Sequence, residues 1–490
     1  MRATTRRMLD YTILEELEPV FYPRSIAVVG ASPNEAKIGS QWLKGLIACG
    51  FSGDVYPVNP RGGEVFGLKI YPDLRSITGL VDLVIVCIPR GGVLPLLDDC
   101  AAKQVKAVYF FTAGFSEVGD PKWSWVEGEM VSRARSGRFR IIGPNCFGVY
   151  SPEHGMPYGP FCLRTAVGRV GVISQSSGHL GKIIEFASMR GLGLSKAVSV
   201  GNACDLGCVD FLKYLAVDSK TTVIGLYVEG PRNARGLFEM LRAACQVKPV
   251  VVWKGGRSTA GARSAVSHTG ALSSSAVTWS VALRQAGAIE VEGLDEMTDT
   301  LLLLDKVGQV RRGNLGVVCG LTDGGGGEAV MVSDACAQLG IDVPALKEKA
   351  GHELVDLIGE VGSVLCNPVD MSQRQRDPQT LRRAMEVVAG EPQVDLIVVY
   401  ENAGVILDSF PESTAEALNA TIGDFARGQE KPVLVVLQHG PAENRRVQIE
   451  RSLAGAGIAV FPSIERAAKA IANVRRYTTF RDAVADASYG

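Results

Sequence analysis

The stretch Ser25-Ile-Ala-Val-Val-Gly-Ala-Ser32 is an apolar, β-branched run that ends in a loop of small residues. The same pattern returns in Val170-Gly-Val-Ile-Ser-Gln-Ser-Ser-Gly178 and in Leu315-Gly-Val-Val-Cys-Gly-Leu-Thr-Asp-Gly-Gly-Gly-Gly327. Each copy is followed by an amphipathic stretch with helical periodicity. A buried strand that turns through glycine into a helix is the building unit of open α/β sheets. The three copies therefore predict three such sheets.

Further apolar runs follow each copy and are separated by helix-like stretches. Continuous apolar runs are typical of parallel strands that are covered on both faces. The expected strands are Asp54–Asn59, Asp82–Pro89, Lys106–Thr112, Phe139–Gly143, Ser195–Gly201, Thr222–Glu229, Pro249–Lys254, Asp395–Glu401, Pro432–Leu437 and Ile458–Phe461. We therefore expect an α/β chain of three doubly wound domains, over residues 1–150, 151–308 and 309–490, with Val310–Asn314 as the last linker.

The composition is that of a globular protein: 46% of the 490 residues are hydrophobic and the net charge is -1. A chain without a basic field has no electrostatic attraction for nucleic acid. The N-terminal stretch has basic residues but no apolar core of signal-peptide length, and no run of about 20 apolar residues predicts a membrane span. Eleven cysteines in such a chain indicate reduced thiols in the cytoplasm. We interpret Cys204 and Cys208 as buried small hydrophobes, because no second pair or nearby histidine completes a zinc site.

The loop after the first apolar run is a nucleotide-binding position, where backbone N–H groups and a helix N-terminus meet phosphate. NAD is the first alternative, but the glycine after Gly30 is Gly39, so the G-x-G-x-x-G spacing is absent. The next run ends in Val58-Asn-Pro60, where an NAD site has an acidic residue for the ribose. Arg61 instead suits a phosphorylated sugar such as that of CoA, or is a solvated surface arginine.

These residues carry a resemblance to a known family. Phe21-Tyr-Pro-Arg-Ser-Ile-Ala-Val-Val-Gly-Ala-Ser32, Lys37-Ile-Gly39 and Val58-Asn-Pro-Arg61 resemble the CoA-binding domain of ADP-forming acetyl-CoA synthetases, in the succinyl-CoA synthetase superfamily. The family more often has Lys at position 61. The resemblance implies a Rossmann-like CoA-binding domain followed by two flavodoxin-like domains. The CoA-binding residues that it implies are Gly30, Ala31, Ser32, Lys37, Asn59, Arg61, Ile88, Pro89, Thr112, Ala113, Gly114, Asn145 and Cys146.

Two further motifs match this family. They are Thr112-Ala-Gly-Phe-Ser116 and Gly143-Pro-Asn-Cys-Phe-Gly148. The resemblance implies that the second motif lies where the CoA thiol reaches the acyl site. Cys146 is then either a nucleophile or a thiol that lines the substrate, and we favour the lining role because no histidine follows nearby.

His268 is one of only five histidines and lies in Ser264-Ala-Val-Ser-His-Thr-Gly-Ala271, which we expect to be a loop of small residues. A phosphorylated imidazole needs such room, although the chemistry alone favours a satisfied loop histidine over a nucleophile. The Ser-His-Thr-Gly-Ala string resembles the phosphohistidine segment of the family, which implies phosphoryl transfer through His268. A carboxylate must orient the ring, and the resemblance implies Glu229, at the end of an expected strand. The alternative is that Glu229 stabilises the start of the next helix.

A phosphoryl group also needs a cradle of N–H and hydroxyl groups. The family reads Ser-Gln-Ser-Gly where this chain has Ser177 in place of the glycine, followed by His179 as either a proton donor or a structural residue. In the third copy Asp323 stands where the family has an asparagine. Further along the chain, Asn367-Pro-Val-Asp370 matches the Asn-Pro-Val-Asp motif of the family. The phosphate and substrate residues that the resemblance implies are Ser174, Ser176, Ser177, Gly178, Gly201, Asn202, Thr269, Gly270, Gly324 and Gly325. Asp205 is expected at the rim of this site.

No Walker A motif and no ATP-grasp segment occur in the sequence. The resemblance therefore implies a separate ATP-grasp β subunit that holds ATP or ADP with Mg, in a hetero-oligomer; we expect no metal site on this chain. The implied activity is an acid–CoA ligase that interconverts acyl-CoA, phosphate and a nucleoside diphosphate with a carboxylic acid, CoA and the triphosphate. A regulatory CoA-binding subunit without catalysis and an NAD-dependent oxidoreductase are the alternatives. The acid, the choice of ADP or GDP and the stoichiometry stay open.

Overall fold

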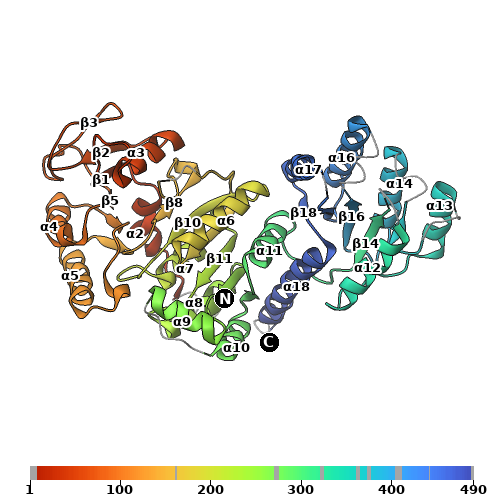
Figure 1. Cartoon of the computed structure of the whole chain (residues 1–490). Coiled ribbons are helices and arrows are strands. Elements are labelled where there is room, and N and C mark those ends of the chain that lie inside the picture. Colours follow the sequence, from red (N-terminus) through yellow and green to blue (C-terminus); the bar gives the residue numbers. More distant parts are fainter. Residues whose placement is uncertain are drawn as a thin grey trace. The chain divides into compact units, whose positions relative to one another are not determined.

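A computed structural model describes residues 8–160, 163–269, 275–320, 325–359, 365–371, 377–402, 411–440 and 442–486 (Figure 1). Contacts between residues divide the chain into two compact units. The first comprises Met1–Ser188, Leu192–Met297 and Val484–Gly490, and the second comprises Met189–Gly191 and Thr298–Ala483. The first unit contains two large sheets and the second contains one. The three domains proposed from the sequence would hold one large sheet each, except that residues 149 and 150 of the first proposed domain pair with the second sheet.

The first sheet has five parallel strands in the order β2-β1-β5-β6-β7. Its strands are β1 (Ser25–Val29), β2 (Asp54–Val58), β5 (Leu83–Val86), β6 (Ala107–Phe110) and β7 (Arg140–Ile142). The helices around it are α3 (Ile38–Cys49), α4 (Val93–Lys103) and α5 (Pro121–Gly137), with the short helices η1 (Arg90–Gly92) and η2 (Ser116–Val118) and the hairpin β3 (Glu64–Val65) and β4 (Leu68–Lys69). Helix α2 (Thr12–Phe21) precedes β1 and packs on elements of the second sheet's region. The strand order reverses between β1 and β5, which is where open α/β sheets bind ligands.

The second sheet has the order β13-β12-β11-β9-β10-β8. Its strands are β8 (Val149–Tyr150), β9 (Val167–Ser174), β10 (Leu194–Ser199), β11 (Val223–Val228), β12 (Val250–Lys254) and β13 (Ile289–Val291). The helices of this region are η3 (Pro152–His154), α6 (Ser177–Met189), α7 (Cys208–Val217), α8 (Ala234–Ala244), α9 (Thr259–Thr269) and α10 (Ala276–Ala286). Helix α11 (Leu294–Lys306) follows β13, and its residues from Thr298 on belong to the second unit. All pairs are parallel except β10 with β8. The order reverses here between β9 and β11.

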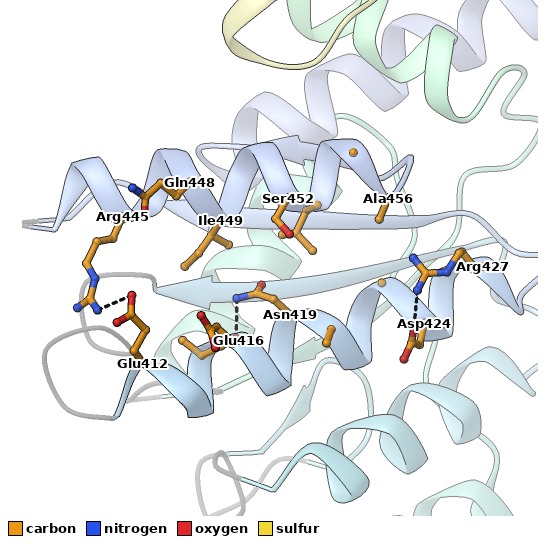
Figure 2. A pocket seen from close by; sticks show the side chains of 15 residues that line it. Glu412, Glu416, Asn419, Asp424, Arg427, Arg445, Gln448, Ile449, Ser452 and Ala456 are labelled. Atoms are coloured by element: carbon orange, nitrogen blue, oxygen red, sulfur yellow. Dashed lines mark hydrogen bonds and ion pairs between the residues drawn. The ribbon is translucent and has the colours of Figure 1, made fainter.

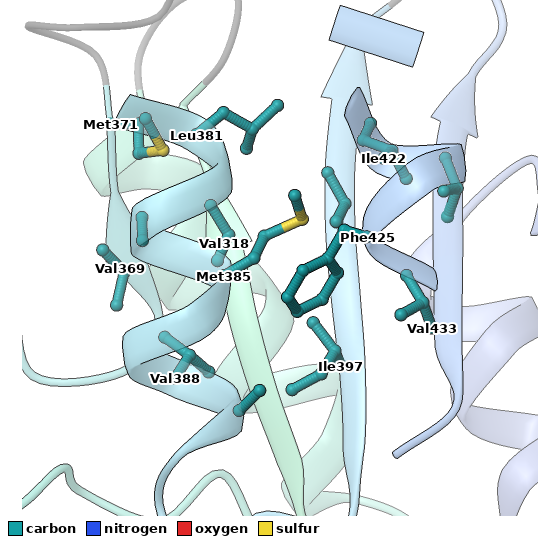
Figure 3. Close-up of a cluster of buried hydrophobic side chains, with 14 of the residues drawn as sticks. Val318, Val369, Met371, Leu381, Met385, Val388, Ile397, Ile422, Phe425 and Val433 are labelled. Atoms are coloured by element: carbon teal, nitrogen blue, oxygen red, sulfur yellow. The ribbon is translucent and has the colours of Figure 1, made fainter. Parts of the chain in front are cut away.

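The third sheet, in the second unit, has five parallel strands in the order β15-β14-β16-β17-β18. Its strands are β14 (Leu315–Cys319), β15 (Val369–Asp370), β16 (Leu396–Asn402), β17 (Val433–Gln438) and β18 (Ala459–Phe461). Its helices are α12 (Gly325–Ala337), α13 (Glu348–Ile358), α14 (Pro378–Ala389), α16 (Glu412–Arg427), α17 (Glu443–Gly455) and α18 (Ile464–Asp486). Met385 from α14 and Phe425 from α16 meet over Ile397 of β16 in the core of one face (Figure 3).

The fold class expected from the sequence is confirmed. Each expected strand overlaps a strand of the structure, because the apolar runs are buried on both faces as parallel strands require. The antiparallel pairing of β8 was not predicted, since Val149 and Tyr150 form a strand too short to read from periodicity. Within the described ranges, no helix combines the length and apolar character needed to cross a membrane.

Candidate functional site

The loop after β1 lies at the point where the first sheet reverses its strand order. Gly30 has φ +103°, and a Cβ there would lie 2.6 Å from the carbonyl oxygen of Cys87, which follows β5. Only glycine allows this approach without a shift of the backbone. Asn59 holds the loop from the other side, because its Nδ2 donates a hydrogen bond to the carbonyl of Ala31 at 2.6 Å. Gly30, Ala31 and Asn59 therefore shape the expected nucleotide position.

Three other predicted CoA-binding residues border this loop. Ser32 is held by Ser40, whose hydroxyl accepts from the Ser32 N–H and donates to the Ser32 carbonyl. Lys37 is exposed and precedes α3, and Arg61 is exposed after β2. Both cations are thus accessible to solvent, as contact with an anionic group would require.

A cavity of about 360 Å³ opens beside this loop, and one of the residues that line it, Ser177, comes from the second sheet's region. Six of the predicted residues line it: Ile88, Thr112, Ala113, Asn145, Cys146 and Ser177. The remaining lining residues, which the sequence did not single out, are Ile38, Cys87, Phe111 and Phe147. Pro89 and Gly114 adjoin lining residues in the chain, and Gly114 has φ +97°. Thr112 is fixed because its hydroxyl donates to the carbonyl of Ile88 at 2.7 Å.

Cys146 lies on the wall of this cavity but is only 2% exposed. Its thiol points toward the carbonyl of Phe110, with Sγ and O 3.7 Å apart. Burial raises the pKa of Cys146 to about 12, so the thiolate needed for nucleophilic attack is strongly disfavoured. This geometry supports the interpretation of Cys146 as a lining residue.

The loop that carries Cys146 is anchored to the second sheet. The N–H of Phe147 donates to the hydroxyls of Ser177 and Ser199, both at 3.1 Å. Gly201 has φ +51°, and a Cβ there would lie 2.2 Å from the carbonyl oxygen of Pro144. The N–H of Asn202 donates to this same carbonyl at 3.0 Å. The cavity wall is thus formed jointly by the two regions of the first unit.

Not every residue expected at the rim faces the cavity. The amide of Asn202 donates to the carboxylates of Glu117 and Glu127, at 2.6 Å and 3.0 Å. Asp205 forms an ion pair with Arg140 at 2.9 Å and accepts from the N–H of Ile141. These contacts join the second region to the first sheet. The Asp205 carboxylate is therefore a structural bridge.

The Ser174–Gly178 segment connects β9 to α6. The Ser174 hydroxyl donates to the carbonyl of Ser176 at 2.7 Å, and the Ser176 hydroxyl accepts weakly from the N–H of His179 at 3.4 Å. Ser177 opens the helix and Gly178 is exposed. The segment thus presents a helix N-terminus with hydroxyls at the place where the second sheet reverses its strand order.

Glu229 follows β11 on the other side of this reversal and is 7% exposed. Its N–H and that of Gly230 both donate to Gln175 Oε1, at 2.9 Å and 3.0 Å. Lys254 Nζ donates to the Glu229 carbonyl at 2.7 Å. The Tyr227 hydroxyl donates to Glu229 Oε1 at 3.0 Å. Backbone and carboxylate of Glu229 are therefore both held in place.

His268 lies in α9, not in the expected loop, so that expectation was wrong. Helix formation is supported by Ser258, whose hydroxyl accepts from the N–H of Gly261 at 3.0 Å, and by several alanines. Helix α9 packs against η2, beside the loop that carries Thr112 and Ala113. The side chains of His268 and Thr269, and all of Gly270, lie outside the described residues.

The comparisons with known proteins agree with this geometry. Residues 24–152 match a family model described as a CoA binding domain, and residues 167–304 match a succinyl-CoA ligase like flavodoxin domain. An ADP-forming acetate–CoA ligase I subunit alpha from Pyrococcus furiosus is 32% identical over 95% of this chain and 98% of its own length. An ADP-forming acetate–CoA ligase I from Archaeoglobus fulgidus is 33% identical over 94% of this chain, which spans 64% of that relative.

A solved structure gives the same result. The dinucleotide forming acetyl-coenzyme A synthetase 1 of Ca. Korarchaeum cryptofilum, in complex with phosphate and ADP, is similar with a TM-score of 0.84 and 31% identity, over 96% of this chain and 98% of that one. The chain belongs to the ADP-forming acyl-CoA synthetase family. Both matched domains of this chain contain a strand-order reversal, and the cavity between their loops is the candidate site.

The sequence did not assign roles to Gln175 and Tyr227. Gln175 enters the sequence prediction only as part of the Ser174–Gly178 motif. Its hydrogen bond from the N–H of Glu229 joins segments that are 54 residues apart, so no local pattern in the sequence indicates this contact. Tyr227 stands two positions before Glu229, which directly follows β11, and a spacing of two in an extended chain turns both side chains to the same side. His179 stacks on Tyr227 with ring centroids 4.3 Å apart, and this contact is one that a structural residue makes.

The region of the third sheet carries only two of the predicted phosphate residues, Gly324 and Gly325. Gly324, Thr322 and Asp323 lie outside the described residues, and Gly325 is the first residue of α12. A cavity of about 570 Å³ lies between α16 and α17, near the Glu412–Arg445 ion pair, and contains none of the predicted site residues (Figure 2). Among the residues that the structure describes, no three His, Cys, Asp or Glu side chains are grouped to hold a metal ion.

Proposed function

We propose that this chain is the CoA-binding, phosphohistidine-carrying subunit of a nucleoside-diphosphate-forming acid–CoA ligase. The observation that carries the proposal is the cavity at the first unit's domain junction, which is lined by the CoA-domain residues Thr112, Asn145 and Cys146 and by Ser177 at the start of α6. Family membership supports the same conclusion, since the Pyrococcus relative named as a subunit alpha matches over nearly its full length.

The proposed reaction proceeds in three reversible steps. A phosphate oxygen attacks the acyl carbon of acyl-CoA, the C–S bond breaks, and the CoA sulfur leaves and takes up a proton. A ring nitrogen of His268 then attacks phosphorus, the bond from phosphorus to the acyl oxygen breaks, and the carboxylate leaves. Finally a terminal oxygen of ADP or GDP attacks phosphorus, which breaks the N–P bond and forms the triphosphate. The covalent intermediate on His268 divides the transfer of the phosphoryl group from acyl phosphate to the nucleoside diphosphate into two easier steps.

The residues have distinct roles in this proposal. Gly30, Asn59, Lys37 and Arg61 hold the nucleotide end of CoA, and the cavity beyond Thr112 receives the thioester. Ser174, Ser176, Ser177 and Gly178 form the N–H and hydroxyl cradle for phosphate. Glu229 orients the imidazole of His268 and stabilises its positive charge. Thr269, Gly270, Gly324 and Gly325 complete the phosphate contacts as the resemblance implies.

The proposal requires a partner. We infer a separate ATP-grasp β subunit that binds the nucleotide with Mg, because the Pyrococcus relative is named as one subunit of its enzyme. The carboxylic acid is left to experiment.

The test uses the chain together with a candidate ATP-grasp subunit, radiolabelled inorganic phosphate and a panel of acyl-CoAs. We expect an acid-labile, base-stable label on this chain that is absent in His268→Ala. The acyl-CoA that gives the fastest labelling identifies the acid. CoA binding by calorimetry without label from any acyl-CoA, using a partner of proven activity, would reject phosphoryl transfer and leave a CoA-binding regulator. Binding of NADH without binding of CoA would reject both.

A further inference from the structure

The carboxylate of Glu229 accepts a hydrogen bond from the buried hydroxyl of Tyr227. The Tyr227 hydroxyl donates to Glu229 Oε1 at 3.0 Å, and Tyr227 itself is 4% exposed. Because successive side chains alternate in direction along an extended chain, the side chain of Tyr227 in β11 and that of Glu229 directly after it point to the same side. A buried hydrogen bond to a carboxylate fixes its rotation and is among the stronger hydrogen bonds in proteins.

The ring of Tyr227 is itself fixed on two sides. His179 stacks on it with centroids 4.3 Å apart and planes at 21°, and Trp253 meets it edge-on with centroids 4.7 Å apart. The paired strands place Ser174, Tyr227 and Trp253 in one row across β9, β11 and β12. The hydroxyl therefore has little freedom to leave the Glu229 carboxylate.

Gly255 provides the space that this pair needs. A Cβ at position 255 would lie 2.4 Å from the Tyr227 hydroxyl oxygen and 3.2 Å from Glu229 Cγ. Gly255 has no positive φ that would otherwise require glycine. The absence of a side chain at Gly255 therefore leaves room for the hydrogen bond between the Tyr227 hydroxyl and the Glu229 carboxylate.

We propose that Tyr227 is a positioning residue, which holds the Glu229 carboxylate in the orientation that serves the phosphohistidine. The proposal rests on the function proposed above for Glu229 and His268. Tyr227 acts as the donor at every accessible pH, since burial and the nearby carboxylate raise the pKa of Tyr227 well above its ordinary value. It transfers no proton and contacts the reaction only through Glu229.

The experiment measures the rate of His268 labelling from acetyl-CoA and radiolabelled phosphate, with the partner subunit, across a pH series. We expect Tyr227→Phe to slow labelling by about tenfold and to move the acid side of the pH profile to higher pH, because the carboxylate loses a donor to its charged form. Gly255→Ala should have the same effects. Tyr214→Phe is the matched control. Tyr214 is also buried, and its hydroxyl donates to the carboxylate of Glu18 at 3.4 Å, but neither residue belongs to the candidate site.

A double-mutant cycle separates positioning from a general structural effect. If Tyr227 acts through Glu229, Tyr227→Phe should change the rate by less than about twofold when Glu229→Gln is already present. An unchanged rate and pH profile in Tyr227→Phe, or an equal slowing in both backgrounds, would overturn the proposal. Failure of wild-type chain to label at all is a different result, which rejects the proposed function itself.

Discussion

Ser177 lines the candidate site at a position where the resemblance drawn from the sequence implies a glycine. Its hydroxyl accepts from the N–H of Phe147 at 3.1 Å and contacts the Ser199 hydroxyl at 3.2 Å, and it lines the cavity. The serine therefore both narrows the cavity and ties α6 to the loop that carries Cys146. Under the proposed function, this position limits the size of the acyl group.

We expect Ser177→Gly to raise the ratio of kcat/KM for a bulky acyl-CoA over acetyl-CoA by about tenfold. The reason is that one methylene-sized change in a pocket alters discrimination by roughly 10-fold to 200-fold. Steady-state kinetics on an acyl-CoA series measure the ratio. Ser177→Ala is the matched control: it removes the hydrogen bonds but retains the Cβ, so it should shift the ratio less. Equal ratios in wild type and Ser177→Gly would exclude a role in size selection.

Glu401 is a buried carboxyl in β16 of the third sheet. It is 0% exposed, and neither carboxylate oxygen has a hydrogen-bond partner within the part of the chain that the structure describes. Burial raises the pKa of Glu401 from an ordinary 4.5 to about 7. The folded state therefore binds this proton more tightly than the unfolded state. Stability that Glu401 contributes as a neutral acid must be lost as pH rises from about 4.5 to about 7.

We expect the free energy of unfolding to fall over this pH range by an amount on the order of 3 kcal/mol, because each pH unit of pKa difference is worth about 1.4 kcal/mol. Glu401→Gln should flatten this part of the profile. Urea unfolding at a series of pH values, followed by a probe in the second unit, measures the effect. Glu416→Gln on the exposed side of α16 is the control and should leave the slope unchanged. A slope that survives in Glu401→Gln would show that another group causes it.

At the scale of elements, the site depends on how two loops meet. The turn after β10 contacts the Gly143–Asn145 turn after β7, with the N–H of Cys204 donating to the Gly143 carbonyl at 2.9 Å. A Cβ on Gly201 would lie 2.2 Å from Pro144 O and 2.5 Å from Asn145 O. Asn145 lines the cavity, so any displacement of its turn changes the cavity wall.

We therefore expect Gly201→Ala to destabilise the first unit by about 1–3 kcal/mol and to weaken CoA binding, because the alanine is strained at φ +51° and collides with backbone. Chemical denaturation and calorimetric CoA titration measure the two effects. Gly207→Ala is a nearby control, since its Cβ would meet only Ala203 Cβ, at 3.5 Å. If Gly201→Ala and Gly207→Ala bind CoA equally well, the loop contact does not govern the cavity.

The elements differ in how far sequence predicts them. Strands such as β9 and β11 were predictable because parallel strands buried on both faces are continuous apolar runs. The segment around His268 was misread, because its small residues suit a loop and its alanines also suit a helix. The contact of Gln175 with Glu229 could not be predicted, since a hydrogen bond between two strand ends depends on register, which no local pattern encodes. Tyr227 was within reach through its spacing from Glu229.

At the scale of the whole molecule, the two compact units have separate cores. The first sheet packs around residues such as Val84, Leu97 and Phe110, and the third around residues such as Met385 and Phe425. The candidate CoA cavity lies wholly within the first unit. A ligand stabilises only the cooperative unit to whose native state it binds. CoA should therefore act on the two units unequally.

We expect calorimetric unfolding of the full chain to show two transitions, of which CoA raises only one. At 100 times its Kd, CoA should stabilise that transition by about 2.7 kcal/mol. Hydrogen exchange with and without CoA would assign it, with added protection in β1, β5 and β6 and none in β16 and β17. Glu401→Gln marks the other transition, because it should move that one alone. Equal shifts of both transitions with CoA, or CoA-dependent protection in the third sheet, would mean that the units unfold as one body and that CoA binding is not confined to the first.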